Sequence, residues 1–327
     1  MTDNGRMHPN RADAALDLAK LAMALLVVGI HTEPFAFNLW LDRGFGMVTR
    51  LCVPFFYVAT SYLYWRREPA KPAGKYLLRM FVLYAVWVLI YLPLDIRKMP
   101  RWPLSMYVDT FLLSGYRHLW FLSSSIFGFL IVYLLSKRLS VRAILIVSTA
   151  FLFFGCCEST WTPLTGRFLR LGVSEYISRR NPVFYAFPYM AMGKYIAAQK
   201  PDARAGRMGI GLGLGLSALL LAAESYVFVV KLRTEATLRW FSVFPMTYCF
   251  FRLLLSCSAR IDRTAARRCR NVSTLVYCVH PYFIRWLYPY FGNAALFGMV
   301  SALSIAAAYL IVRLSERRGF GALKYLY

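Results

Sequence analysis

Long apolar segments, separated by short polar ones, run through most of this 327-residue sequence. A membrane-spanning helix needs about 20 mostly apolar residues, and fewer when the helix is short or broken. The pattern therefore predicts an all-α fold, a polytopic membrane helix bundle of about ten transmembrane helices. The predicted spans are residues 15–36, 49–65, 75–94, 117–136, 141–157, 182–198, 208–230, 238–256, 272–290 and 293–314.

The composition agrees with a membrane protein, because 59% of the residues are hydrophobic. A net charge of +24 would favour a nucleic-acid partner in a soluble chain, but here the basic residues flank the apolar segments. We therefore expect membrane lipids and no nucleic acid as partners. Alternate loops hold more Lys and Arg over less length than the loops between them, so the positive-inside rule predicts that both termini are cytoplasmic.

A single transmembrane domain is expected over residues 1–327, with cytoplasmic tails at 1–14 and 315–327. No small-residue cleavage site follows the first apolar segment, so we expect an uncleaved first helix. The seven cysteines form no CxxC motif and are expected to be apolar packing residues. Alternating glycines in the seventh span favour close helix packing. These glycines are Gly209, Gly211, Gly213 and Gly215.

Lys20 and His31 share the first apolar segment, eleven residues apart. Polar groups inside a membrane span are costly and usually serve a pathway or a chemistry. At about 100° per residue the spacing places both side chains on one helix face. At about 1.5 Å per residue it separates them by roughly 16 Å, half of a bilayer core. One face therefore carries a cation in the cytoplasmic half and a titratable imidazole in the outer half.

Other polar residues near the outer ends of spans are candidates to surround one outward-facing cavity with His31. They are Arg50, His118, Arg180, Glu224 and His280. Taken singly, each is also explained as an interfacial residue at a helix end. No HxxxH or HxxE pair would supply two metal ligands from one helix, so no metal site is expected. A histidine of pKa about 6.5 can take a proton from a hydroxyl and return it to a leaving thiolate, as acyl transfer requires.

Two basic residues one turn apart open the third span, Lys75 and Arg79. Cations at this cytoplasmic position are candidates to bind the phosphates of an acyl donor. Positive-inside topology with lipid phosphate contacts explains them equally well.

Six motifs occur in an order that resembles the acyltransferase-3 family of bacterial membrane acyltransferases, across essentially the whole chain. They are LDLAKLAMALLVVGIH (Lys20, His31), TRLCVPFFYVATSYLYW (Arg50), KYLLRM (Lys75, Arg79), RHLWFL (His118, Trp120), SRRNPVFYAFPYMAMGKYI (Arg180, Asn181) and STLVYCVHPYFI (His280).

The resemblance implies an O-acyltransferase of the bacterial inner (plasma) membrane. Such an enzyme takes an acyl group, usually acetyl from acetyl-CoA, on the cytoplasmic side and places it on a hydroxyl of an extracytoplasmic cell-envelope glycan or glycolipid. His31 would be the catalytic base, and Lys20 would assist donor binding or the acyl route. Lys75 and Arg79 would help hold acyl-CoA, which is a co-substrate; no tightly bound cofactor is expected. Candidates for substrate binding are Arg50, His118, Trp120, Arg180, Asn181 and His280.

Two departures from the family pattern stand out. Many members have Arg where this chain has Lys20, and many have an acidic pair where Ser125 and Ile126 stand here. A carboxylate partner for His31 is therefore unassigned. Candidates for it are Glu33, Glu158 and Glu224.

Two alternatives remain open. The first is a small-molecule transporter or exporter on the same scaffold, without acyl transfer; the branch with RHLWFL also includes the membrane part of vancomycin-resistance serine racemases. The second is an unrelated membrane-bound O-acyltransferase fold with an intramembrane histidine, against which the motif order argues.

Overall fold

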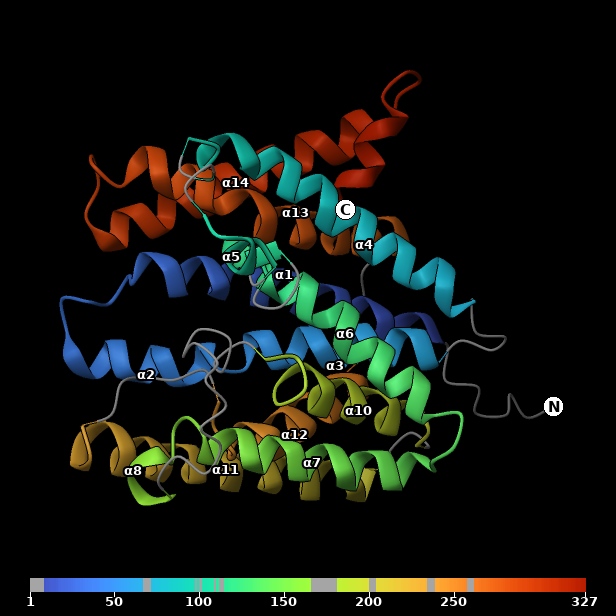
Figure 1. Ribbon diagram of the computed structural model, residues 1–327, viewed down its shortest axis with the longest axis vertical. Coiled ribbons are helices and arrows are strands. Elements are labelled where there is room, and N and C mark those ends of the chain that lie inside the picture. Colours follow the sequence, from blue (N-terminus) through green and yellow to red (C-terminus); the bar gives the residue numbers. More distant parts are fainter. Residues whose placement is uncertain are drawn as a thin grey trace.

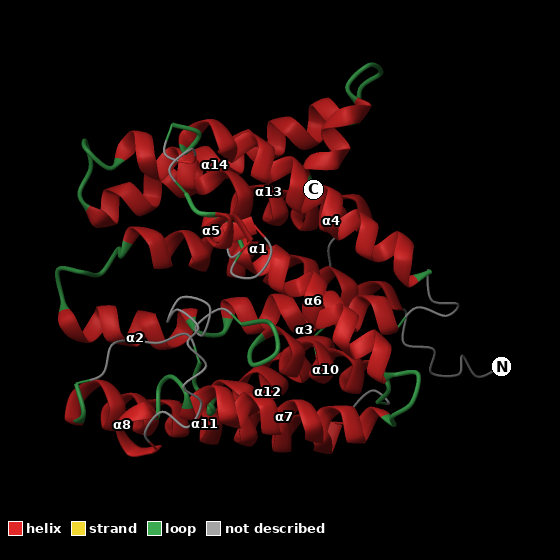
Figure 2. Cartoon of the chain, in the orientation of Figure 1, coloured by secondary structure: helices red, strands yellow, loops and turns green. Residues whose placement is uncertain are grey.

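The computed structural model describes residues 9–66, 72–97, 99, 102–108, 110–111, 115–165, 181–199, 204–233, 239–257 and 262–327. Within this part of the chain every regular element is a helix, which confirms the predicted all-α fold (Figure 2). The α-helices are α1 (Pro9–Thr32), α2 (Leu39–Thr49), α3 (Cys52–Trp65), α4 (Ala73–Tyr91), α5 (Leu104–Val108), α6 (Trp120–Leu135), α7 (Val141–Cys157), α8 (Thr162–Thr165), α10 (Ala186–Ala197), α11 (Arg204–Ser225), α12 (Val243–Ser256), α13 (Arg263–Leu287) and α14 (Asn293–Ser315). Short 3-10 helices are η1 (Leu92–Leu94), η4 (Arg117–Leu119) and η6 (Gly321–Leu326), and the π-helix η5 (Tyr226–Lys231) continues α11.

Among the described residues, five helical stretches are long and apolar enough to cross a membrane. They are Ala14–Thr32, Ala73–Leu94, Arg117–Leu135, Gly206–Lys231 and Asn293–Ser315, and two shorter apolar helices are Val141–Cys157 and Val243–Ser256. Each of the ten predicted spans overlaps a helix. The protein is therefore a membrane protein, whereas the count of ten crossings and the cytoplasmic side of the termini stay predictions.

The second predicted span, residues 49–65, contains a helix that ends at the same residue, but a further helix before it was not predicted. Its helix α3 is preceded by α2, and only Arg50 and Leu51 separate the two, both in right-handed helical conformation. The interruption follows from Pro54, which has no N–H to donate to the carbonyl of Arg50. The sequence prediction missed α2 because the charged residues Asp42 and Arg43 interrupt its apolar pattern.

α10 lies at the centre of one half of the bundle, with α3, α6, α7 and α12 packed around it (Figure 1). Its residues from Ala186 to Lys194 are all buried. A Cβ added at Gly193 would lie 2.5 Å from the carbonyl oxygen of Val58, so only glycine fits this close approach of α10 to α3. The Ser61 hydroxyl on α3 also donates a hydrogen bond to the carbonyl of Met190, at 2.6 Å.

The expectation of close helix packing is wrong for three of the four alternating glycines of α11. A Cβ at Gly209, Gly211 or Gly215 would meet no atom within 4 Å. Gly213 is the exception, because its Cβ would lie 3.0 Å from the Cys249 sulfur. The physical reason is that these three positions face outward, where a lipid-facing helix tolerates small residues without needing them.

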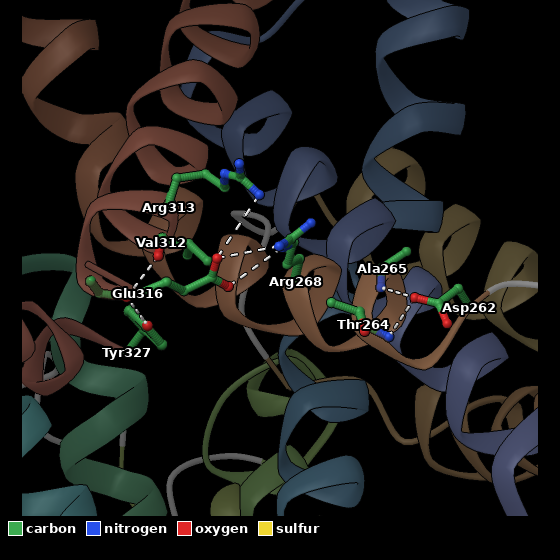
Figure 3. A network of polar contacts seen from close by, with 9 residues as sticks. Asp262, Thr264, Ala265, Arg268, Val312, Arg313, Glu316 and Tyr327 are labelled. Atoms are coloured by element: carbon green, nitrogen blue, oxygen red, sulfur yellow. Dashed lines mark hydrogen bonds and ion pairs between the residues drawn. The ribbon is translucent and has the colours of Figure 1, made fainter. Parts of the chain in front are cut away.

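α1, α13 and α14 pack together in the other half of the bundle, with α4 beside η6 (Figure 1). Arg268 on α13 and Glu316 after α14 form an ion pair at 3.2 Å (Figure 3). The same figure shows Asp262 capping the start of α13, where its carboxylate accepts from the backbone N–H of Thr264 at 2.9 Å. The C-terminal residues fold back, and the carbonyl of Leu326 accepts from the indole N–H of Trp87 on α4, at 2.9 Å.

Candidate functional site

Three histidines from separate elements meet at one point of the fold. His31 lies at the end of α1, His118 in η4 and His280 on α13. The rings of His31 and His280 stack with centroids 5.3 Å apart, and the rings of His118 and His280 meet edge to face at 5.5 Å. His280 is fully buried, whereas the His31 side chain is exposed. The fold therefore brings together three residues that the sequence analysis placed at the outer ends of different spans.

A cavity of about 350 Å³ opens beside these rings. We call it the histidine cavity. Its lining residues are His31, Tyr91, Leu94, Arg117, His118, Pro281, Ile284 and Arg285, and His280 lies buried behind the rings of His31 and His118. Because His31 is exposed at its wall, a molecule in this cavity has access to the imidazole.

The buried His280 ring is oriented by its own helix. Its Nδ1 lies 3.1 Å from the carbonyl oxygen of Val276, one turn earlier, and because a carbonyl can only accept, Nδ1–H donates this hydrogen bond. The next residue, Pro281, has no N–H and leaves the carbonyl of Tyr277 without its helical donor. The Tyr277 hydroxyl in turn donates to the carbonyl of His118. α13 thus fixes two of the three histidines.

Asp95 holds the turn that presents His118. Its carboxylate binds the Arg117 guanidinium through two hydrogen bonds of 2.7 and 2.6 Å and accepts a third from the Tyr116 hydroxyl at 2.5 Å. Burial and the neighbouring Asp95 carboxylate raise the pKa of Tyr116 to about 12, so its hydroxyl remains a donor at neutral pH. Gly115 and Arg117 both have positive φ, of 74° and 51°. These contacts offset the backbone strain at Arg117.

Lys20 lies deep in the bundle, beside an acid that the sequence analysis overlooked. Its Nζ is 3.0 Å from the Asp17 carboxylate, and both side chains are buried. Arg270 on α13 lies 3.9 Å from the second oxygen of Asp17. Because Asp17 contacts Arg270 and His31 stacks on His280, α1 and α13 run side by side in the same direction. The face of α1 that carries Lys20 and His31 is the face toward α13.

The other two residues predicted to bind the acyl donor do not lie beside Lys20. Lys75 and Arg79 are exposed in the first turns of α4, whereas Lys20 is buried between α1 and α13. The fold therefore presents two surface cations at one end of α4, and a third cation inside the bundle.

Of the described residues predicted to bind substrate, His118 lines the histidine cavity and His280 lies buried behind it, whereas the other three lie elsewhere. The guanidinium of Arg50 lies over the ring of Trp240, 4.0 Å from its centroid. Trp120 stacks against Tyr185 at 6.1 Å. Asn181 accepts a hydrogen bond from the backbone N–H two residues later, at 2.9 Å, and so shapes the turn before α10. Arg180 lies outside the described residues.

None of the three candidate carboxylates lines the histidine cavity. Glu224 accepts hydrogen bonds from the Trp161 indole at 2.8 Å and from the backbone N–H of Ser242 at 3.0 Å, which ties it to the start of α12. Glu33 follows α1 with a positive φ of 49°, and Glu158 ends α7. The charged network nearest the cavity instead contains Asp95, whose place in the fold no motif of the sequence indicated.

Among known proteins, a family profile and two curated relatives resemble this chain. The family profile described as an acyltransferase domain (acyltransferase-3) matches residues 13–313. Two curated relatives are both named amino-acid racemase, from Enterococcus faecalis. One is 27% identical over 58% of this chain and 29% of its own length, the other 23% identical over 92% of this chain and 46% of its own length.

The chain thus spans less than half the length of these two relatives. No solved structure matches it. The family profile, in contrast, covers nearly the whole chain, from the first to the last long helix. This chain therefore belongs to the acyltransferase-3 family of membrane acyltransferases.

Proposed function

We propose that this protein transfers an acyl group, usually acetyl, from cytoplasmic acyl-CoA to a hydroxyl of a cell-envelope glycan or glycolipid outside the bacterial inner membrane. The observation that carries the proposal is the exposed imidazole of His31 in a cavity shared with His118 and backed by the buried His280. Membership of the acyltransferase-3 family supports acyl transfer as the type of reaction.

In the proposed reaction His31 accepts the proton of the acceptor hydroxyl while the hydroxyl oxygen attacks the thioester carbonyl carbon. The carbon–sulfur bond then breaks, and His31 returns the proton to the leaving thiolate. The products are an ester on the acceptor and the free thiol of CoA. Histidine suits both transfers because its ordinary pKa lies near neutral pH.

The donor is proposed to approach from the opposite end of α1. Lys20 lies about 16 Å along the helix from His31, on the same face. Phosphate groups of acyl-CoA would contact Lys75 and Arg79, which are exposed at the start of α4. Lys20 would then contact the donor or its acyl arm on the way to His31.

Purified protein in nanodiscs tests the proposal. We expect CoA release from radiolabelled acetyl-CoA by the wild-type protein and its loss in His31→Ala. His8→Ala is the matched control, because His8 precedes the membrane domain in the sequence, and we expect it to retain wild-type release. Equal release by His31→Ala and the wild type would refute His31 as the base, and no release by the wild type with an envelope extract as acceptor would refute acyl transfer.

The second candidate is a small-molecule transporter on the same scaffold. Both relatives carry the name amino-acid racemase, so an amino acid is the small molecule with which to test it. Uptake of radiolabelled L-serine into proteoliposomes without acetyl-CoA would support this alternative. Uptake equal to that of empty liposomes would argue against it.

A further inference from the structure

Arg285 brings a positive charge to the histidine cavity that the proposed acyl transfer does not use. It lies on α13, four residues after Pro281, so one helix face presents both residues to the cavity. Its side chain is exposed. Arg285 is therefore available to a molecule that enters beside His31.

The charges around the cavity are unbalanced. Its lining holds two guanidinium groups and no carboxylate among the described residues. The charge of Arg117 is compensated by Asp95, with an ion-pair distance of 2.6 Å. Arg285 has no ion-pair partner among the residues that the structure describes. A cleft with low-dielectric walls concentrates the field of such a charge and favours an anion.

The volume of the cavity limits the size of the molecule that carries this anionic group. Its volume of about 350 Å³ is near the lower end of the range for ligand pockets, roughly 300–1,000 Å³. This space suits one sugar-sized unit rather than a length of polymer. A guanidinium binds carboxylate and phosphate oxygens through two parallel hydrogen bonds, which fixes orientation as well as affinity.

We propose that the acceptor is a hydroxyl-bearing unit with an anionic group, and that Arg285 binds this group while His31 faces the hydroxyl. The inference rests on the proposed function, which supplies the reaction. Binding of the anionic group to the protein can nevertheless be measured without any acyl transfer. Arg285 is a specificity-determining residue in this scheme, and uronic acids and sugar phosphates share the required chemistry.

Binding is measured by saturation-transfer NMR on protein in nanodiscs, with D-glucuronate, glucose 6-phosphate and D-glucose as probes. Comparison of the first two probes shows whether the site prefers a carboxylate or a phosphate, and glucose is the uncharged reference. We expect at least one anionic probe to bind about 10- to 100-fold more tightly than glucose, as a charge-assisted contact gives. Arg285→Gln is expected to abolish this preference, and Arg285→Lys to restore it in part.

Arg43→Gln is the matched control, because Arg43 lies on α2 and does not line the cavity; we expect it to bind all three probes as the wild type does. Equal binding of the three probes by the wild type would overturn the inference, as would an anion preference that survives in Arg285→Gln. CoA release that depends on His31 but not on acceptor charge would overturn the inference alone. An Arg285-dependent anion preference without CoA release would overturn the acyltransferase proposal alone.

Discussion

The imidazole rings of His31 and His280 stack with centroids 5.3 Å apart and planes inclined by 25°, although the two residues lie near opposite ends of the sequence. One ring is exposed in the cavity and the other is fully buried. The buried ring is held by Val276 and limits how His31 can turn. The two residues therefore have different roles: His31 is accessible to substrate, and His280 orients the His31 ring.

Replacement of His31 by alanine is expected to abolish CoA release and leave stability nearly unchanged. Because the side chain is exposed, its loss should alter the unfolding free energy by about 0.5 kcal/mol or less. Activity and the melting temperature in detergent are the two measurements. A large fall in melting temperature would show that His31 is mainly a packing residue.

His280→Leu is expected to reduce kcat by about tenfold or more without lowering the melting temperature. The Nε2 atom of His280 is buried and forms no hydrogen bond among the described residues, so an apolar residue of similar volume removes a desolvation cost. The loss of activity would follow from a less restrained His31 ring. Full activity in a stable His280→Leu protein would mean that the stacked pair has no part in the reaction.

Asp95→Asn is expected to weaken the turn that carries His118. The substitution removes the bidentate contact with Arg117, whose side chain is 38% exposed, so solvent screening limits the cost to about 1 kcal/mol. We expect increased hydrogen exchange at residues 115–119 and lower activity. Arg117→Lys should show a smaller effect of the same sign, since one ammonium contact replaces a fork; unchanged exchange in both variants would contradict the proposed role.

Asp17→Asn is expected to destabilise the protein by about 3–5 kcal/mol, because it removes the carboxylate that Lys20 and Arg270 share inside the bundle. The double variant Asp17→Leu/Lys20→Met should recover most of the loss. Lys20→Arg should retain activity, because a guanidinium at this position can still contact Asp17. Thermal unfolding of Asp17→Leu, Lys20→Met and their double variant gives the coupling energy, and additive effects would exclude a direct interaction.

Gly193→Ala is expected to destabilise the contact between α3 and α10 by about 1–3 kcal/mol. Its new Cβ would meet the backbone carbonyl of Val58 at 2.5 Å, which a side-chain rotation cannot relieve. Gly211→Ala is the matched control on α11, where a Cβ meets no atom within 4 Å, and it should be neutral or slightly stabilising. Equal melting temperatures for the two variants would disprove the close approach.

Apolar segment length accounts for most of the helix positions, because burying a backbone in a membrane requires continuous helical hydrogen bonding. The exceptions are local. α2 was missed because polar residues interrupt its apolar pattern, and the glycines of α11 were misjudged because small residues are also tolerated on an outward face.

The sequence by itself determined the all-helical membrane architecture and the shared face of Lys20 and His31, since both follow from the fixed period and rise of one helix. The tertiary structure decided the partners: His280 for His31, Asp95 for the turn of His118, and Arg270 beside Asp17. Such contacts join helices far apart in the chain, and their distances depend on how side chains of different helices interlock. Periodicity along one helix carries no information about that packing.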